Sequence, residues 1–309
     1  MRRVVAAMLA LATLAAGCAR PAPQPAAALS PSPPGDAAPD KDAIVLVPDG
    51  YTGRFRAFGT VLENVSADGP KHGPQLCGGV QQSLPPQCSG LDVANWSWAA
   101  VPHESAQGAK WGDYEVIVTL DPGRNRLTLK ATPVVPVPAT GDPTVGRPEP
   151  NTPCPAPPGG WRPVDPTRAT DGALQAAVEL ARGSKDFAGV WIDQNQPVVT
   201  ERTANDPTKL ILTVAYRTDL ARHEAELRQV WGGALCVVAG GRTHAELLRI
   251  LRETVRLPGV RGGGVDEIRN AVSLDVWVAW QSRQRELDSR YGSGAVRQEP
   301  LLKPIDLSG

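Results

Sequence analysis

Twelve prolines lie between Thr132 and Arg168. Proline has no backbone N–H to donate and fixes its φ angle, so neither a helix interior nor an inner strand runs through such a stretch. The chain therefore folds as two parts, which we predict as one domain at residues 43–135 and another at residues 169–309. Residues 136–168 are the predicted linker between them.

Residues 43–135 carry strand patterns and no helical period. The segments AIVLVPDGY and RFRAFGTVLENV are β-rich, and YEVIVTLDPGRNRLTLKATPVV reads as two strands around the turn DPGRN. We expect a small all-β domain of about five strands that closes into a barrel-like, OB-like shape.

Residues 169–309 alternate helical and strand patterns. Helices are expected at 171–182, from the cap Asp219 to Trp231, from the Thr243/Glu246 capping box onward, and at 281–291. Strands are expected at FAGVWID, at the continuously apolar KLILTVAYRTD, at ALCVVAG and at the alternating AVSLDVWVAW, whereas RGGGVDEIRN reads as a flexible loop. The pattern predicts an α+β domain with helices on a sheet.

The first residues are those of a secretory signal. Arg2 and Arg3 precede an apolar run that is too short for a membrane span, and small residues end it before Cys18. The segment Leu14-Ala15-Ala16-Gly17-Cys18 resembles the lipobox of bacterial lipoproteins. This resemblance implies that residues 1–17 are removed, that Cys18 is lipidated, and that the chain is anchored to the bilayer at the extracytoplasmic face of the cell membrane. The alternative is an ordinary secretory signal. Residues 18–42, rich in proline and alanine, then form a tether.

Four further cysteines, Cys77, Cys88, Cys154 and Cys236, are an even number, which is typical of disulfides outside the cytoplasm. Three connectivities exist, and we expect Cys77–Cys88 across a Gly- and Pro-containing loop, together with Cys154–Cys236. The alternative is zinc ligation. The chain has no CxxC pair, so no metal is predicted.

Composition and motifs exclude several functions. Lysine plus arginine equals aspartate plus glutamate, 32 each, so the chain lacks the basic footprint of a nucleic-acid-binding protein. His223-Glu224 lacks the second histidine that a zincin helix needs, and we expect His223 and His244 on helix surfaces. No G-x-S-x-G nucleophile motif occurs. The carboxylate pairs Asp113/Glu115 and Asp266/Glu267 read as solvated loop residues, and no cofactor is predicted.

Tryptophans are the remaining candidates for binding. Trp96 and Trp98 are two residues apart, so on a strand they point the same way, and with Trp111 they would form a platform for sugar rings. The alternative, which we favour, is that they fill the barrel core. In the second domain, Trp277 and Trp280 have opposite parity on one strand, which predicts that one of them is exposed.

Two family resemblances complete the sequence picture. FAGVWID, KLILTVAYRTDLARHEAELR and RNAVSLDV are together similar to the pro-regions of bacterial secreted chymotrypsin-like proteases, whereas CGGVQQSLPPQCSG and RYGSGAV resemble uncharacterised actinobacterial surface lipoproteins. We therefore expect a non-enzymatic binding or interaction module that contacts an envelope protein or cell-wall glycan. The alternatives are a wall- or carbohydrate-acting enzyme and a chaperone-like partner of a secreted enzyme.

Overall fold

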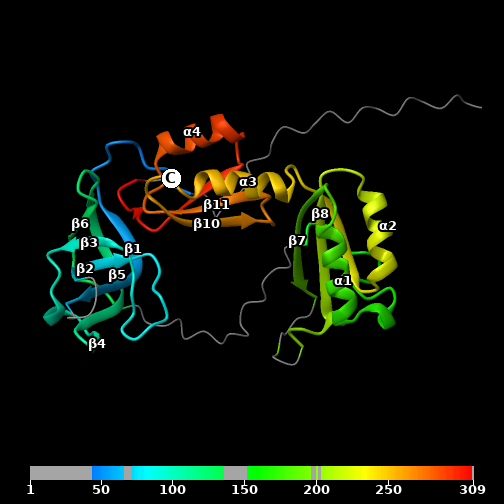
Figure 1. The fold of residues 1–309 in the computed structure, drawn as a ribbon, viewed down its shortest axis with the longest axis horizontal. Helices are drawn as coiled ribbons and strands as arrows, with labels where there is room; N and C mark the ends of the chain where they lie inside the picture. The colour runs from blue at the N-terminus through cyan, green and yellow to red at the C-terminus, as the bar shows by residue number, and fades with distance from the viewer. Residues whose placement is uncertain (1–43, 66–70, 136–151, 196–199, 201–202, 308–309) are drawn as a thin grey trace, which may run out of the picture. The chain divides into compact units, whose positions relative to one another are not determined.

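The computed structural model describes residues 44–65, 71–135, 152–195, 200 and 203–307 (Figure 1). The predicted lipidation site Cys18, the tether and residues 136–151 of the proline-rich linker lie outside these residues. Within the described part of the chain, no helix is both long enough and apolar enough to cross a membrane.

The N-terminal part is a five-stranded mixed β-barrel, which confirms the expected OB-like architecture. Its strands pair in the closed ring β1-β2-β3-β6-β5-β1, and in this ring β3 and β6 are parallel whereas the other neighbours are antiparallel. The ring strands are β1 (Phe55–Asn64), β2 (His72–Cys77), β3 (Leu91–Ala94), β5 (Ala109–Asp121) and β6 (Arg126–Leu129). Two short strands, β4 (Glu104–Ala106) and β13 (Lys303–Pro304), extend its sheet.

Alternation along the strands builds the barrel core. Phe55 on β1 and Val116 on β5 are among the fully buried residues that point inward, as period-two patterning requires. Val278 and Leu302, from the C-terminal part of the chain, belong to the same core, and β13 pairs with β1. The barrel is therefore completed by residues that are distant in sequence.

The described residues of the C-terminal part form four α-helices and two three-stranded sheets. In chain order, its elements are α1 (Asp171–Arg182), β7 (Phe187–Gln194), β8 (Leu210–Tyr216), α2 (Leu220–Val230), β9 (Ala234–Ala239), α3 (His244–Thr254), β10 (Val260–Asp266), β11 (Ala271–Val276), α4 (Gln281–Tyr291) and β12 (Val296–Pro300). The order α-β-β-α-β therefore occurs twice. We call residues 170–239 the first repeat and residues 243–300 the second repeat.

The two repeats agree in detail. Asp193 follows the helix cap Thr170 by 23 residues (193 − 170), and Asp266 follows the helix cap Thr243 by the same 23 (266 − 243). In both sheets the central strand is antiparallel to the first strand and parallel to the third. The first strand of each sheet also carries a register shift at the matching place, after Phe187 and after Val260. The C-terminal part thus consists of two copies of one structural repeat.

In each repeat the two helices cover one face of the sheet. Leu212 and Val214 of β8 pack with Leu227 of α2 in the first core, and Leu274 of β11 packs with Leu287 of α4 in the second. The labels of Figure 1 show α1 and α2 beside β7 and β8.

Three local expectations are wrong. Residues 261–266 of the segment predicted as a flexible loop belong to β10, because pairing with β11 uses backbone groups that glycines keep, and residues 267–270 form the turn that follows. Trp96 and Trp98 do not share a strand: β3 ends at Ala94, and Trp98 begins a short 3₁₀ helix. Asp219 precedes α2 in a left-handed conformation, and in the described structure its side chain makes no capping hydrogen bond to that helix.

Candidate functional site

Trp96 and Trp98 pack against the barrel core. Their rings lie 5.4 Å apart, and Trp96 also lies 5.0 Å from Tyr114. The Trp98 indole nitrogen donates to the Glu63 carboxylate over 2.6 Å. Trp111 lies on β5 opposite Glu104. These contacts agree with the alternative that Trp96 and Trp98 fill the barrel core. A ligand-binding role of the three tryptophans stays a prediction.

His223 is buried, and the expectation of a surface histidine is wrong. Its side chain is 2% exposed and stacks on Tyr216, with ring centroids 3.8 Å apart. Arg222 only donates hydrogen bonds, so its 3.0 Å contact makes Nε2 the acceptor and leaves the ring proton on Nδ1, 3.3 Å from Glu226. Burial raises the pKa of Tyr216 to about 12. The cluster is a satisfied buried network.

The second histidine lies where the two repeats meet, with its ring centroid 5.4 Å from that of Phe187 on β7. His244 lies 3.3 Å from a Glu267 carboxylate oxygen, and the other oxygen of Glu267 accepts the Val190 amide of β7 over 2.7 Å. Asn270, in a left-handed conformation, donates to the Arg242 carbonyl and accepts from the Arg242 amide. Its amide also donates to the Ala188 carbonyl over 3.3 Å. The turn between β10 and β11 therefore binds the backbone of β7.

The paired carboxylates make structural contacts. Asp113 accepts from the Thr60 hydroxyl over 2.6 Å, Glu115 lies 3.4 Å from Arg56, and Asp266 lies 2.9 Å from Arg269. Among the described residues, no group of histidine, cysteine, aspartate and glutamate side chains is arranged to hold a metal ion.

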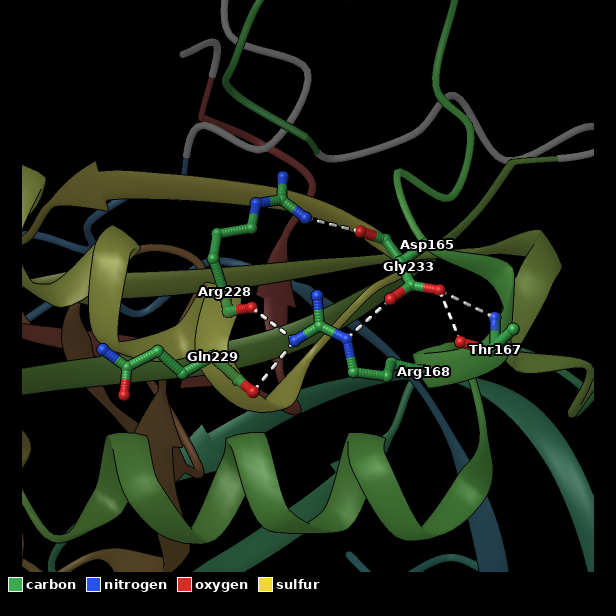
Figure 2. Close-up of polar contacts among 6 residues, drawn as sticks. All are labelled: Asp165, Thr167, Arg168, Arg228, Gln229 and Gly233. Carbon is green, nitrogen blue, oxygen red and sulfur yellow. Dashed lines mark hydrogen bonds and ion pairs between the residues drawn. The ribbon is translucent and has the colours of Figure 1, made fainter.

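A polar cluster just before the first repeat also has a structural role (Figure 2). Arg168 donates to the last carbonyls of α2, those of Arg228 and Gln229, each over 2.9 Å. Asp165 accepts from Thr167 and Arg168, and these hydrogen bonds lower its pKa to about 2. The cluster caps α2 and fixes the chain that leads into α1.

The two disulfides form as predicted. Cys77 bonds to Cys88 in the barrel, and Cys154 bonds to Cys236 of β9. The second bond holds Cys154 and Trp161 against Ile211 and Val238, on the sheet face of the first repeat that the helices leave open.

A groove lies between the barrel and the second repeat. It consists of two cavities of about 220 and 240 Å³ that share Pro122, Trp280 and Arg283 in their walls. Trp277 lines the cavity of about 220 Å³, and the Arg261 guanidinium lies 5.2 Å from the Trp277 ring centroid. Sequence reasoning predicted that one of Trp277 and Trp280 is exposed. Both are half-buried, because β11 ends before Trp277 and Trp280 caps α4 instead of continuing the strand.

Polar groups hold the groove walls in place. Arg283 donates to the Pro258 carbonyl over 3.0 Å, and the Ser282 hydroxyl donates to Asp49. Buried Gln298 donates to the Trp280 carbonyl over 3.1 Å. The barrel side of the groove, including Pro122 and Asn125, had no sequence signal, because only the fold brings it opposite Trp280.

No protein-family model matches the chain, and no curated protein matches it in sequence.

Proposed function

We propose that this protein is a membrane-anchored envelope lipoprotein that acts as a non-enzymatic binding module, with the groove at Trp277, Trp280 and Arg283 as its binding site. The two disulfides indicate an extracytoplasmic protein. The lipobox-like segment before Cys18 supports the anchor.

The residues that line the groove are the main support for this proposal. Two tryptophans and Pro122 offer apolar faces, while the Arg283 guanidinium supplies hydrogen-bond donors and positive charge beside them. Apolar walls with a few converging polar groups are typical of binding sites. The partners that fit this chemistry are an extended segment of an envelope protein and a wall glycan whose rings stack on indole.

The enzymatic alternative finds less support. A glycoside hydrolase needs two carboxyl groups that flank the bond to be broken. Among the described residues that line the two cavities, Asp49 is the one carboxylate, and it accepts a hydrogen bond from Ser282.

The binding test uses the oxidised chain and its intrinsic tryptophan fluorescence. Titration with purified muropeptides, and separately with peptides tiled from envelope proteins, should give saturable changes with one of the two. Trp280→Ala and Arg283→Ala should each weaken binding by about tenfold or more. Trp191→Ala, which replaces a half-buried tryptophan outside both the groove and the Trp96/Trp98/Trp111 set, is the matched control. Binding that survives both groove substitutions would exclude this site.

The anchor is tested separately. In cells, wild-type protein should fractionate with the membrane and incorporate labelled palmitate, and Cys18→Ser should do neither. A Cys18→Ser protein that remains in the membrane would contradict lipid anchoring through this residue.

A further inference from the structure

The groove contains a cation that has no carboxylate partner among the described residues. Arg283 of α4 lines both cavities, and its guanidinium donates to the Pro258 carbonyl over 3.0 Å. Arg285, two residues further along the same helix, does pair with a carboxylate, that of Asp49 at 3.7 Å. A guanidinium has five N–H donors, so Arg283 keeps donors and a positive charge for a bound molecule.

The walls around this cation are mostly aliphatic and aromatic. In the cavity of about 220 Å³, Leu120 of the barrel lies opposite Val276 and Val278 of the second repeat. Asn125 and Gln298 supply two amides, and the Gln298 nitrogen already donates to two acceptors within the protein. A sugar needs several hydrogen-bond partners for its hydroxyl groups, whereas an aliphatic side chain needs none. These walls therefore favour a peptide over a glycan.

The position of the charges favours an anionic group at Arg283. Arg283 is half-buried beside apolar walls, where attraction between opposite charges is stronger than in bulk water, whereas the side chain of Arg285 is 78% exposed. A guanidinium can bind a carboxylate through two parallel hydrogen bonds. The described carboxylate nearest in the groove wall, Asp49, lines the other cavity. Its repulsion directs the apolar part of an anionic ligand toward Leu120 and Val278.

We propose that the groove binds a peptide in which a carboxylate lies next to an aliphatic side chain, with the carboxylate on Arg283 and the aliphatic group in the cavity of about 220 Å³. This inference rests on the proposed function and narrows its two partner classes to one. The carboxylate can come from two sources, the C-terminal group of a chain or the side chain of an internal aspartate. Both present the same two oxygen acceptors to a guanidinium.

The test compares two peptides that differ in one charge. Acetyl-Ala-Ala-Leu with a free C-terminal carboxylate and the same peptide with a C-terminal amide are each titrated into the full oxidised chain, and binding is followed by tryptophan fluorescence. The acid should bind about tenfold more tightly than the amide, the effect of one hydrogen-bonded charge pair. Added salt should weaken binding of the acid and leave binding of the amide unchanged. Acetyl-Ala-Ala-Leu-Asp-Ala amide, which carries the carboxylate on a side chain, shows which source the groove prefers.

Substitutions of Arg283 assign the preference to this side chain. Arg283→Gln removes the charge but keeps a neutral donor for the Pro258 carbonyl, so the acid should bind no more tightly than the amide. Arg283→Lys keeps the charge without the planar pair of donors and should retain part of the preference. Arg252→Gln, which removes an exposed arginine of α3 outside both cavities, is the matched control and should bind like the wild type. Equal urea midpoints for Arg283→Gln and the wild type would separate loss of contact from loss of folding.

The results that would overturn this inference differ from those that would overturn the proposed function. Equal affinities of the acid and the amide, or a preference for the acid that survives Arg283→Gln, would overturn this inference and leave the groove as a binding site. Binding of neutral N-acetylglucosamine oligomers with no binding of the peptides would also overturn it, in favour of a glycan site. Binding of neither the peptides, the muropeptides nor the oligomers would overturn both.

Discussion

The two repeats share one backbone arrangement, but they differ in the sheet face that their helices leave open. In the first repeat this face is apolar, with Ile211 and Cys236 covered by Cys154 and Trp161. In the second repeat, alignment by strand pairing puts Ala271 at the position of Ile211 and Arg297 at that of Cys236. Arg297 pairs there with Glu299 over 3.8 Å.

Strand side chains, not element order, decide how many layers a repeat needs. Every residue of β8 is buried, whereas β11 includes the exposed Asp275 and the half-buried Ser273. A sheet that is apolar on both faces must recruit a cover, and the first repeat takes it from the proline-rich segment before α1. A sheet with one polar face needs none.

The strongest test of this comparison is at matching positions at the C-terminal end of the second helix of each repeat. Trp231 is fully buried and donates to the Ala234 carbonyl, whereas Tyr291 is half-buried and donates to Glu253. Trp231→Ala should lower the free energy of unfolding by about 3–5 kcal/mol, and Tyr291→Ala by about 1–2 kcal/mol. Urea denaturation followed by circular dichroism measures both. Equal losses would mean that the repeats are packed alike.

The next test removes the cover. Cys154→Ser/Cys236→Ser opens a closed loop of 82 residues and frees the covering segment, and it should cost about 2–4 kcal/mol. Amide hydrogen exchange should quicken in β8 and β9 and stay unchanged in β11 and β12. Cys77→Ser/Cys88→Ser, which opens a loop of 11 residues, is the control and should leave exchange in β8 unchanged. Faster exchange in β11 after loss of Cys154–Cys236 would show that the cover serves both repeats.

The smallest effect concerns alkaline pH. Burial raises the pKa of Tyr216 from 10.0 to about 12, so its neutral form is favoured in the folded state. The stability that this shift contributes is complete below pH 10 and is lost as the pH rises through 12, by about 1 kcal/mol at pH 11. Val276 occupies the matching place in the second repeat. Tyr216→Phe should remove this loss in urea titrations at pH 9 and 11, and an unchanged loss would assign it to other groups.

Sequence reasoning succeeded where the pattern is local. The limits of α1 and α4, the Thr243 capping box and both disulfides follow from periodicity, cap chemistry and cysteine context, and the structure confirms them. The continuously apolar segment predicted as a strand forms β8, and every residue of β8 is buried.

It failed where tertiary contacts override local signals. Three glycines made β10 look like a loop, although backbone pairing holds it as a strand. His223 lies on an amphipathic helix, but stacking on Tyr216 buries it. The structural repeat was not recognised from the sequence, because the two repeats share the spacing and pairing of their strands while their exposed faces carry different residues. The groove escaped prediction because its two walls come from distant parts of the chain.

The Cys154–Cys236 bond also has a mechanical consequence. A force that pulls the linker away from α3 would be borne by the Cys154–Cys236 disulfide. It would not stretch α1, β7, β8 or α2, which lie between the two cysteines in the chain. The sequence separation of 82 between the cysteines corresponds to roughly 280 Å of extended chain that a pulling force cannot draw out. For a protein held at one end by a tether and at the other by a partner, the first repeat would behave as a link of fixed length.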